Sequence, residues 1–82
     1  MMVIKILGTG CPNCLRLGQG VAAALHDLGS DATVEKVTNI ADIMSYDVLS
    51  LPAVVIDEKV VVAGRVPDKE ELRSIIQSKL AE

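Results

Sequence analysis

The sequence contains no tryptophan and no phenylalanine, and Tyr46 is its only aromatic residue. Binding of single-stranded nucleic acid relies on aromatic side chains that stack on bases, so this absence argues against that class of function. Basic residues are also few, because eight Lys and Arg stand against eleven Asp and Glu and the formal net charge is -3. An acidic chain is a poor match for a phosphate backbone. We therefore expect no nucleic-acid partner.

Long apolar runs and a leader-like segment are missing as well. No stretch approaches the roughly 20 apolar residues that cross a bilayer, and the first residues lack the basic lead and cleavage site of a signal peptide. These features predict no membrane association and a cytoplasmic location, where thiols are normally kept reduced. Half of the 82 residues are hydrophobic, so the chain can form a core, and we expect one domain over residues 1–82 and a monomer.

Strand and helix patterns alternate along the chain. Short runs rich in β-branched residues predict four strands, at Val3–Leu7, Ala32–Val37, Ala53–Ile56 and Val60–Ala63. Apolar residues at helical spacing predict three helices: one from the Cys11 region to about Leu28, one from Ile40 to about Tyr46, and one from Lys69 to Leu80. The predicted fold is α/β with the order β-α-β-α-β-β-α. It has a four-stranded mixed sheet, with a parallel pair and an antiparallel hairpin, and helices on both faces.

The apolar stripes of the two longer helices identify their buried faces. In the first helix the stripe comprises Leu17, Val21, Ala24, Leu25 and Leu28, and in the last it comprises Leu72, Ile75, Ile76 and Leu80. Asn39 and Asp68 precede the second and third helices and are expected to cap them. Both stripes should therefore pack against the sheet.

The only two cysteines form the motif Cys11-Pro12-Asn13-Cys14, between the first strand and the first helix. Residues at i and i+3 share one helix face about 5–6 Å apart, within the range that a disulfide tolerates. Unpaired N–H groups and the helix dipole at the start of the helix favour a thiolate at Cys11. Pro12 suits the first helical position and stiffens the segment. We therefore expect Cys11 to attack a substrate disulfide and Cys14 to resolve the mixed disulfide.

Other uses of the two thiols stay open at this point. A purely structural disulfide across so short a loop would add only roughly 2 kcal/mol, and two unreactive buried cysteines would not need this spacing. Two thiolates suit Cu(I), whereas zinc needs about four ligands and would require a dimer or ligands from outside the chain. Heavy-metal-associated domains share the strand, Cys-X-X-Cys loop and helix. They usually have Met where this chain has Thr9, and they follow the order β-α-β-β-α-β. An interaction module that docks a partner around Cys11, Leu51 and Tyr46 is a third alternative.

Pro52, directly before a predicted buried strand, sharpens the interpretation. Together with the cysteine motif it resembles the thioredoxin/glutaredoxin superfamily, and more closely the small thioredoxin-like redox-active disulfide proteins of bacteria and archaea. The resemblance covers essentially the whole chain and implies a thioredoxin-like fold. The matching segments are Lys5-Ile6-Leu7-Gly8-Thr9-Gly10-Cys11-Pro12-Asn13-Cys14, Leu51-Pro52-Ala53-Val54-Val55-Ile56-Asp57 and Val62-Ala63-Gly64-Arg65-Val66-Pro67.

The resemblance implies a thiol–disulfide oxidoreductase that reduces protein disulfides through Cys11 and Cys14. It implies that the Leu51–Pro52 bond is cis, that Pro52 packs beside the disulfide and hinders metal capture, and that the backbone of Leu51 pairs with substrate. Pro12 and Asn13 separate the two sulfurs. The expected cofactor set is no metal and no group beyond the redox-active disulfide Cys11–Cys14.

Three departures from the superfamily pattern bear on substrate and mechanism. Gly64-Arg65-Val66-Pro67 lacks the Gly-Gly-X-Asp-like stretch with which many glutaredoxins bind glutathione. The expected partners are therefore protein disulfides and a thioredoxin-reductase-like reductant rather than glutathione. The Trp that thioredoxins carry before the motif is Gly10 here, and the first strand offers Lys5 rather than a buried Asp.

Overall fold

The computed structural model describes residues 2–10, 12–48 and 50–80. Its elements follow the order β-α-β-α-β-β-α, which confirms the predicted fold class: β1 (Val3–Leu7), α1 (Pro12–Leu28), β2 (Thr33–Val37), α2 (Ile40–Met44), β3 (Ala53–Ile56), β4 (Lys59–Ala63) and α3 (Lys69–Leu80). The strands form one sheet in the order β2-β1-β3-β4. β1 and β2 are parallel, and the other two pairs are antiparallel. The order differs from the β-α-β-β-α-β order of heavy-metal-associated domains, because α2 lies between β2 and β3.

The hairpin between β3 and β4 is tighter than the sequence suggested. The residues at its turn, Asp57 and Glu58, have φ angles of 49° and 70°. Two successive positive φ angles are typical of a type I′ turn, which matches the twist of its strands. Lys59 therefore pairs with Ile56 and belongs to β4 rather than to the turn.

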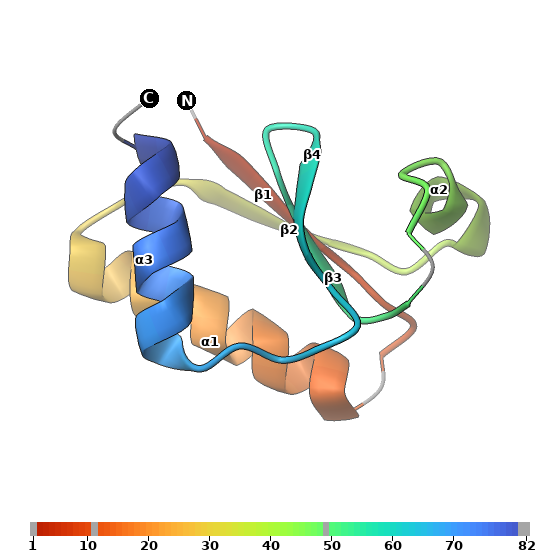
Figure 1. The fold of residues 1–82 in the computed structure, drawn as a ribbon, viewed down its shortest axis with the longest axis horizontal. Helices are drawn as coiled ribbons and strands as arrows, with labels where there is room; N and C mark the ends of the chain where they lie inside the picture. Colours follow the sequence, from red (N-terminus) through yellow and green to blue (C-terminus); the bar gives the residue numbers. More distant parts are fainter. Residues whose placement is uncertain (1, 11, 49, 81–82) are drawn as a thin grey trace.

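The larger core lies on the face of the sheet that α1 and α3 cover together (Figure 1). Its buried residues are Met2, Ile4, Ile6, Leu17, Val21, Ala24, Leu25, Val54, Ile56, Val62, Leu72 and Ile76. The two helices approach closely at Gly20, where an added Cβ would lie 2.9 Å from Cδ1 of Leu72. This core fixes the direction of α1 and hence the place where α1 begins.

The opposite face of the sheet carries a smaller core under the short helix α2 (Figure 1). Its buried residues are Leu7, Ile43, Val48, Ala53 and Val55. Asn39 caps α2 as expected, because its Oδ1 accepts hydrogen bonds from the N–H groups of Ala41 (2.8 Å) and Asp42 (3.3 Å). Both faces of the sheet are therefore covered by helices, as the fold prediction required.

A polar cluster borders this smaller core where α2 does not reach. The Nζ of Lys5 donates to Glu58 Oε1 at 2.7 Å and to Tyr46 Oη at 2.8 Å, and Tyr46 Oη donates to Glu58 Oε2 at 3.1 Å. The hydrogen bonds to Glu58 and then to Tyr46 raise the pKa of Lys5. The pKa of Glu58 is lowered, chiefly by the hydrogen bond that it accepts from Lys5. All three groups are thus satisfied while the stem of Lys5 stays partly buried.

The prediction that Leu80 is buried is wrong. Leu72 and Ile76 are buried and Ile75 is partly buried, but Leu80 is 47% exposed. Leu80 lies two turns beyond Leu72 on the same helix face, about 12 Å further along the axis. α3 crosses α1 near its own N-terminal half, so its last turn runs past the helix it packs against (Figure 1).

Across the described ranges, no helix has both the length and the apolar character needed to cross a membrane.

Replacing Leu72 by Ala should destabilise the protein by about 2–5 kcal/mol, because it leaves a cavity between α1 and α3. Leu80→Ala is the matched control and should change the free energy of unfolding by less than about 0.5 kcal/mol. Urea unfolding followed by circular dichroism measures both. Equal losses in the two variants would contradict the described packing of α3.

Candidate functional site

The site lies at the end of the sheet where β1 finishes and β3 begins. Leu7 is paired with Ala53 on β3 and with Val37 on β2. The next residue, Gly8, donates its N–H to the carbonyl of Val37 at 3.0 Å. The antiparallel register brings Pro52, directly before Ala53, to the same end of the sheet as Gly8. Loops that are far apart in the sequence therefore meet here.

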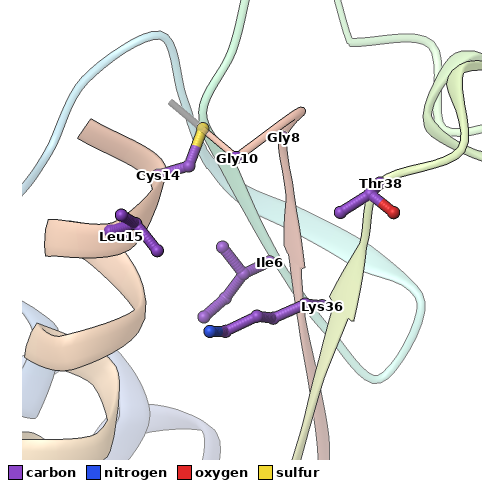
Figure 2. Close-up of a pocket in the computed structure, with 7 residues that line it drawn as sticks. All are labelled: Ile6, Gly8, Gly10, Cys14, Leu15, Lys36 and Thr38. Atoms are coloured by element: carbon purple, nitrogen blue, oxygen red, sulfur yellow. The ribbon is translucent and has the colours of Figure 1, made fainter. Parts of the chain in front are cut away.

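Cys14 lies in the first turn of α1, directly against this sheet end. It is buried and disulfide-bonded. A Cβ added to Gly8 would lie 2.3 Å from its Sγ, so the sulfur occupies the space that a side chain at Gly8 would fill. Figure 2 shows the sulfur directed toward Gly8 and Gly10. The predicted nucleophile Cys11 lies outside the described residues, so its role and its pairing with Cys14 stay predictions.

The start of α1 has the electrostatic character expected from the sequence. Pro12 is its first residue, as predicted, and Asn13 follows exposed to solvent. The first turn contains no acidic residue. The positive end of the helix dipole is therefore not offset by a carboxylate, which favours an anion such as a thiolate near this end.

Leu51 and Pro52 approach the site from the β3 side. Their peptide bond is cis, and Pro52 is buried while Leu51 is 39% exposed. The carbonyl of Pro52 accepts a hydrogen bond of 2.9 Å from the N–H of Gly64. A Cβ at Gly64 would lie 2.8 Å from Cβ of Ser50, and Gly64 has a φ of 79°. Glycine at this position therefore lets the chain after β4 hold the Leu51–Pro52 segment in place.

Tyr46, which the interaction-module alternative placed on the same surface as Cys11 and Leu51, does not lie there. It packs against the smaller core, on the face of the sheet opposite α1. Its hydroxyl reaches Glu58, in the turn at the far end of β3 from Pro52. The sequence prediction failed because α2 ends at Met44, so Tyr46 turns back toward the sheet.

A small pocket opens beside Cys14, on the β2 side of β1. Its lining is mostly apolar and consists of Ile6, Gly8, Gly10, Cys14, Leu15, Lys36 and Thr38 (Figure 2). Gly8, Lys36 and Thr38 were not predicted to belong to the site. For Gly8, the one sequence signal for such a role is its place just before the cysteine motif.

The described residues offer no additional metal ligands at the site. No group of three or more His, Cys, Asp or Glu within those residues could hold a metal ion. A soft metal at this site would therefore depend on Cys14 and on Cys11, outside the described part of the chain.

The chain matches a known protein family and known proteins over most of its length. The family model described as "Thioredoxin domain" matches residues 2–77. A thioredoxin of Methanocaldococcus jannaschii is 39% identical over 80 residues, covering 98% of this chain and 92% of that protein. A thioredoxin of Methanothermobacter thermautotrophicus is 38% identical over 76 residues, covering 93% of this chain and 99% of that protein.

Solved structures show the same fold at much lower sequence identity. A structure titled as that of a malarial protein has a TM-score of 0.73 at 15% identity and covers 98% of both chains. A structure of thioredoxin-2, described as a component of the malaria parasite protein secretion machinery, has a TM-score of 0.73 at 14% identity and covers 95% of this chain and 82% of the other. These structures share the fold, and the matching family model and the two archaeal relatives show that the chain belongs to the thioredoxin family, a family of thiol–disulfide oxidoreductases.

Proposed function

We propose that this protein reduces protein disulfides with the dithiol of Cys11 and Cys14. The thiolate of Cys11 attacks one sulfur of the substrate disulfide, forming a mixed disulfide and releasing the other sulfur as a thiolate that takes a proton from water. The thiolate of Cys14 then attacks the Cys11 sulfur, which closes the disulfide Cys11–Cys14 and releases the second substrate thiol. Two electrons pass from the dithiol to the substrate.

One observation supports this proposal above the others. The sulfur of Cys14 is disulfide-bonded and is seated against Gly8, at the sheet end that Pro52 also borders. A purely structural disulfide would not need to lie in the first turn of a long helix, in a turn that contains no acidic residue. A reversible one benefits from both features, because they stabilise the thiolate of the reduced form.

Supporting roles follow for the neighbouring residues. Pro12 begins the helix, and with Asn13 it sets the separation of the two sulfurs. Leu51 offers its backbone to an extended substrate chain. Among residues 2–10, 12–48 and 50–80 its backbone groups have no hydrogen-bond partner. Pro52, buried beside the site, crowds the two sulfurs and so hinders a metal ion from binding both.

The proposed partners are protein disulfides and a dithiol reductant of the thioredoxin-reductase type. The protein acts as a monomer in the cytoplasm, with no cofactor beyond its own disulfide and without nucleic-acid or membrane partners. A reducing compartment keeps the dithiol ready for a new substrate after each turnover.

The variant Cys14→Ser should accumulate a mixed disulfide between Cys11 and its substrate, because no second thiol is present to resolve it. Mass spectrometry of the variant incubated with a disulfide-containing protein detects the adduct. The double variant Cys11→Ser/Cys14→Ser is the control and should form none. Undiminished disulfide reduction by Cys11→Ser would contradict the assigned nucleophile.

The variant Gly8→Ala should slow the step in which Cys14 resolves the mixed disulfide. The added methyl group would overlap the sulfur of Cys14, and a displacement near 1 Å at a reacting group can cost about a hundredfold in rate. We expect a loss of roughly ten- to a hundredfold, with the mixed disulfide accumulating in stopped-flow and quench measurements. Gly18→Ala is the control, because its Cβ would make only ordinary contacts. Equal rates in the two variants would show that the position of Cys14 does not depend on Gly8.

A further inference from the structure

The pocket beside Cys14 lies on the opposite side of β1 from the Leu51–Pro52 segment. The sheet order β2-β1-β3-β4 places β2, with Lys36 and Thr38, on one side of β1 and β3 on the other. A substrate chain that pairs with Leu51 therefore leaves this pocket open to another part of the substrate. Leu15, on the rim, is 51% exposed. The walls suit an aliphatic side chain, because most of their surface is hydrocarbon.

Lys36 lies along this pocket with its stem on apolar surface. Its register partner on β1 is Ile6, whose buried side chain packs on the α1 side of the sheet. The Cε of Lys36 lies 3.8 Å from the position of a Cβ added to Gly18, which places the stem against α1. Figure 2 shows the lysine extended beside Ile6 toward the helix. A long cationic side chain in this arrangement keeps its ammonium group available at the pocket rim.

The charge at the pocket is opposite to the charge of the protein. Among the described residues that line it, Lys36 alone is charged, and its side chain has no ion-pair or hydrogen-bond partner within the described part of the chain. The chain as a whole has a net charge of -3. The first turn of α1 adds no acidic side chain. The pocket is thus a locally positive site on an acidic protein, and the complementary ligand carries a carboxylate.

From these observations we infer that the pocket is a substrate subsite for an aliphatic side chain next to the reacting cysteine of a protein disulfide, and that Lys36 selects substrates with a carboxylate beside that side chain. The inference rests on the proposed function. The expected substrate sequence has an aliphatic residue and an acidic residue adjacent to the reacting cysteine. Thr38 lies at the same rim, with its methyl carbon on the side of the other lining residues (Figure 2).

The subsite acts on the first exchange step. A segment bound there holds the substrate disulfide near the start of α1 while the S–S bond of the substrate breaks and the bond to Cys11 forms. Because the pocket is also lined by Cys14, the same segment stays close to the resolving sulfur during the second exchange. Lys36 therefore acts as a specificity residue and takes no part in the transfer of electrons.

Three synthetic peptide disulfides test this inference. Each contains a Cys-Leu pair, and they differ only in the residue next to that pair, which is Glu, Gln or Lys. The reduced protein is regenerated by dithiothreitol, and kcat/KM is measured by chromatography of the peptides. The wild-type protein should prefer the Glu peptide over the Gln peptide by about three- to fivefold, the range of a partly exposed ion pair. It should prefer the Glu peptide over the Lys peptide by about tenfold, and added salt should reduce both ratios.

Substitutions at two lysines separate the subsite from a general charge effect. Lys36→Met keeps the aliphatic stem and should abolish the preference, whereas Lys36→Arg should retain it. Lys59→Met, in β4, removes the same charge elsewhere and should leave the preference unchanged. Urea unfolding confirms that each variant is folded. Replacing Leu by Gly in the Glu peptide should lower kcat/KM, since the apolar walls then lose their ligand.

The outcomes distinguish this inference from the proposed function. Equal reduction of all three peptides by the wild-type protein, or a preference that survives in Lys36→Met, overturns the subsite and leaves the oxidoreductase in place. If the wild-type protein reduces neither the Gln peptide nor any other disulfide, the proposed function itself is overturned.

Discussion

The contact between Gly8 and the sulfur of Cys14 is the constraint on which the site depends. Gly8 directly follows the central strand β1, whose register with both neighbours fixes its place. Cys14 is fixed from the other side, because the packing of α1 on the sheet determines where the helix begins. The missing side chain at Gly8 is what allows the two to meet. Sheet register and helix packing thus jointly determine the position of one sulfur atom.

The two faces of the sheet have different structural roles. The face under α1 and α3 holds the larger core and positions the start of α1, where Cys14 lies. The other face has only the five-residue helix α2, and the cluster of Lys5, Tyr46 and Glu58 borders the part that α2 leaves open. Lys5 is thus a structural residue of this second face. It does not take the place of the buried Asp that belongs to the superfamily pattern near the cysteines.

Most of the fold could be predicted from the sequence because its signals are local. β-branched runs, helical stripes and the cap at Asn39 depend on neighbouring residues, and the structure agrees with them. The misses are non-local. Leu80 continues an apolar stripe, but its burial depends on how far α1 extends beneath α3, and sequence periodicity contains no crossing geometry. Lys36 and Gly8 belong to the site only through sheet register. The cysteine motif together with Pro52 therefore predicted the class of chemistry but not the pocket beside it.

The placement of β1 at the centre of the sheet has a consequence for how the chain assembles. β1 is made first, yet its partners on β2 and β3 follow about 30 and 50 residues later in the sequence. The parallel half, β1-α1-β2, can close once Val37 has been synthesised, but the second edge of β1 stays unpaired until Ile56 has emerged. Closing such long loops costs entropy before the contacts form. The second edge of the strand that leads to the cysteine motif therefore lacks its partner while the 19 residues from Thr38 to Ile56 are being added.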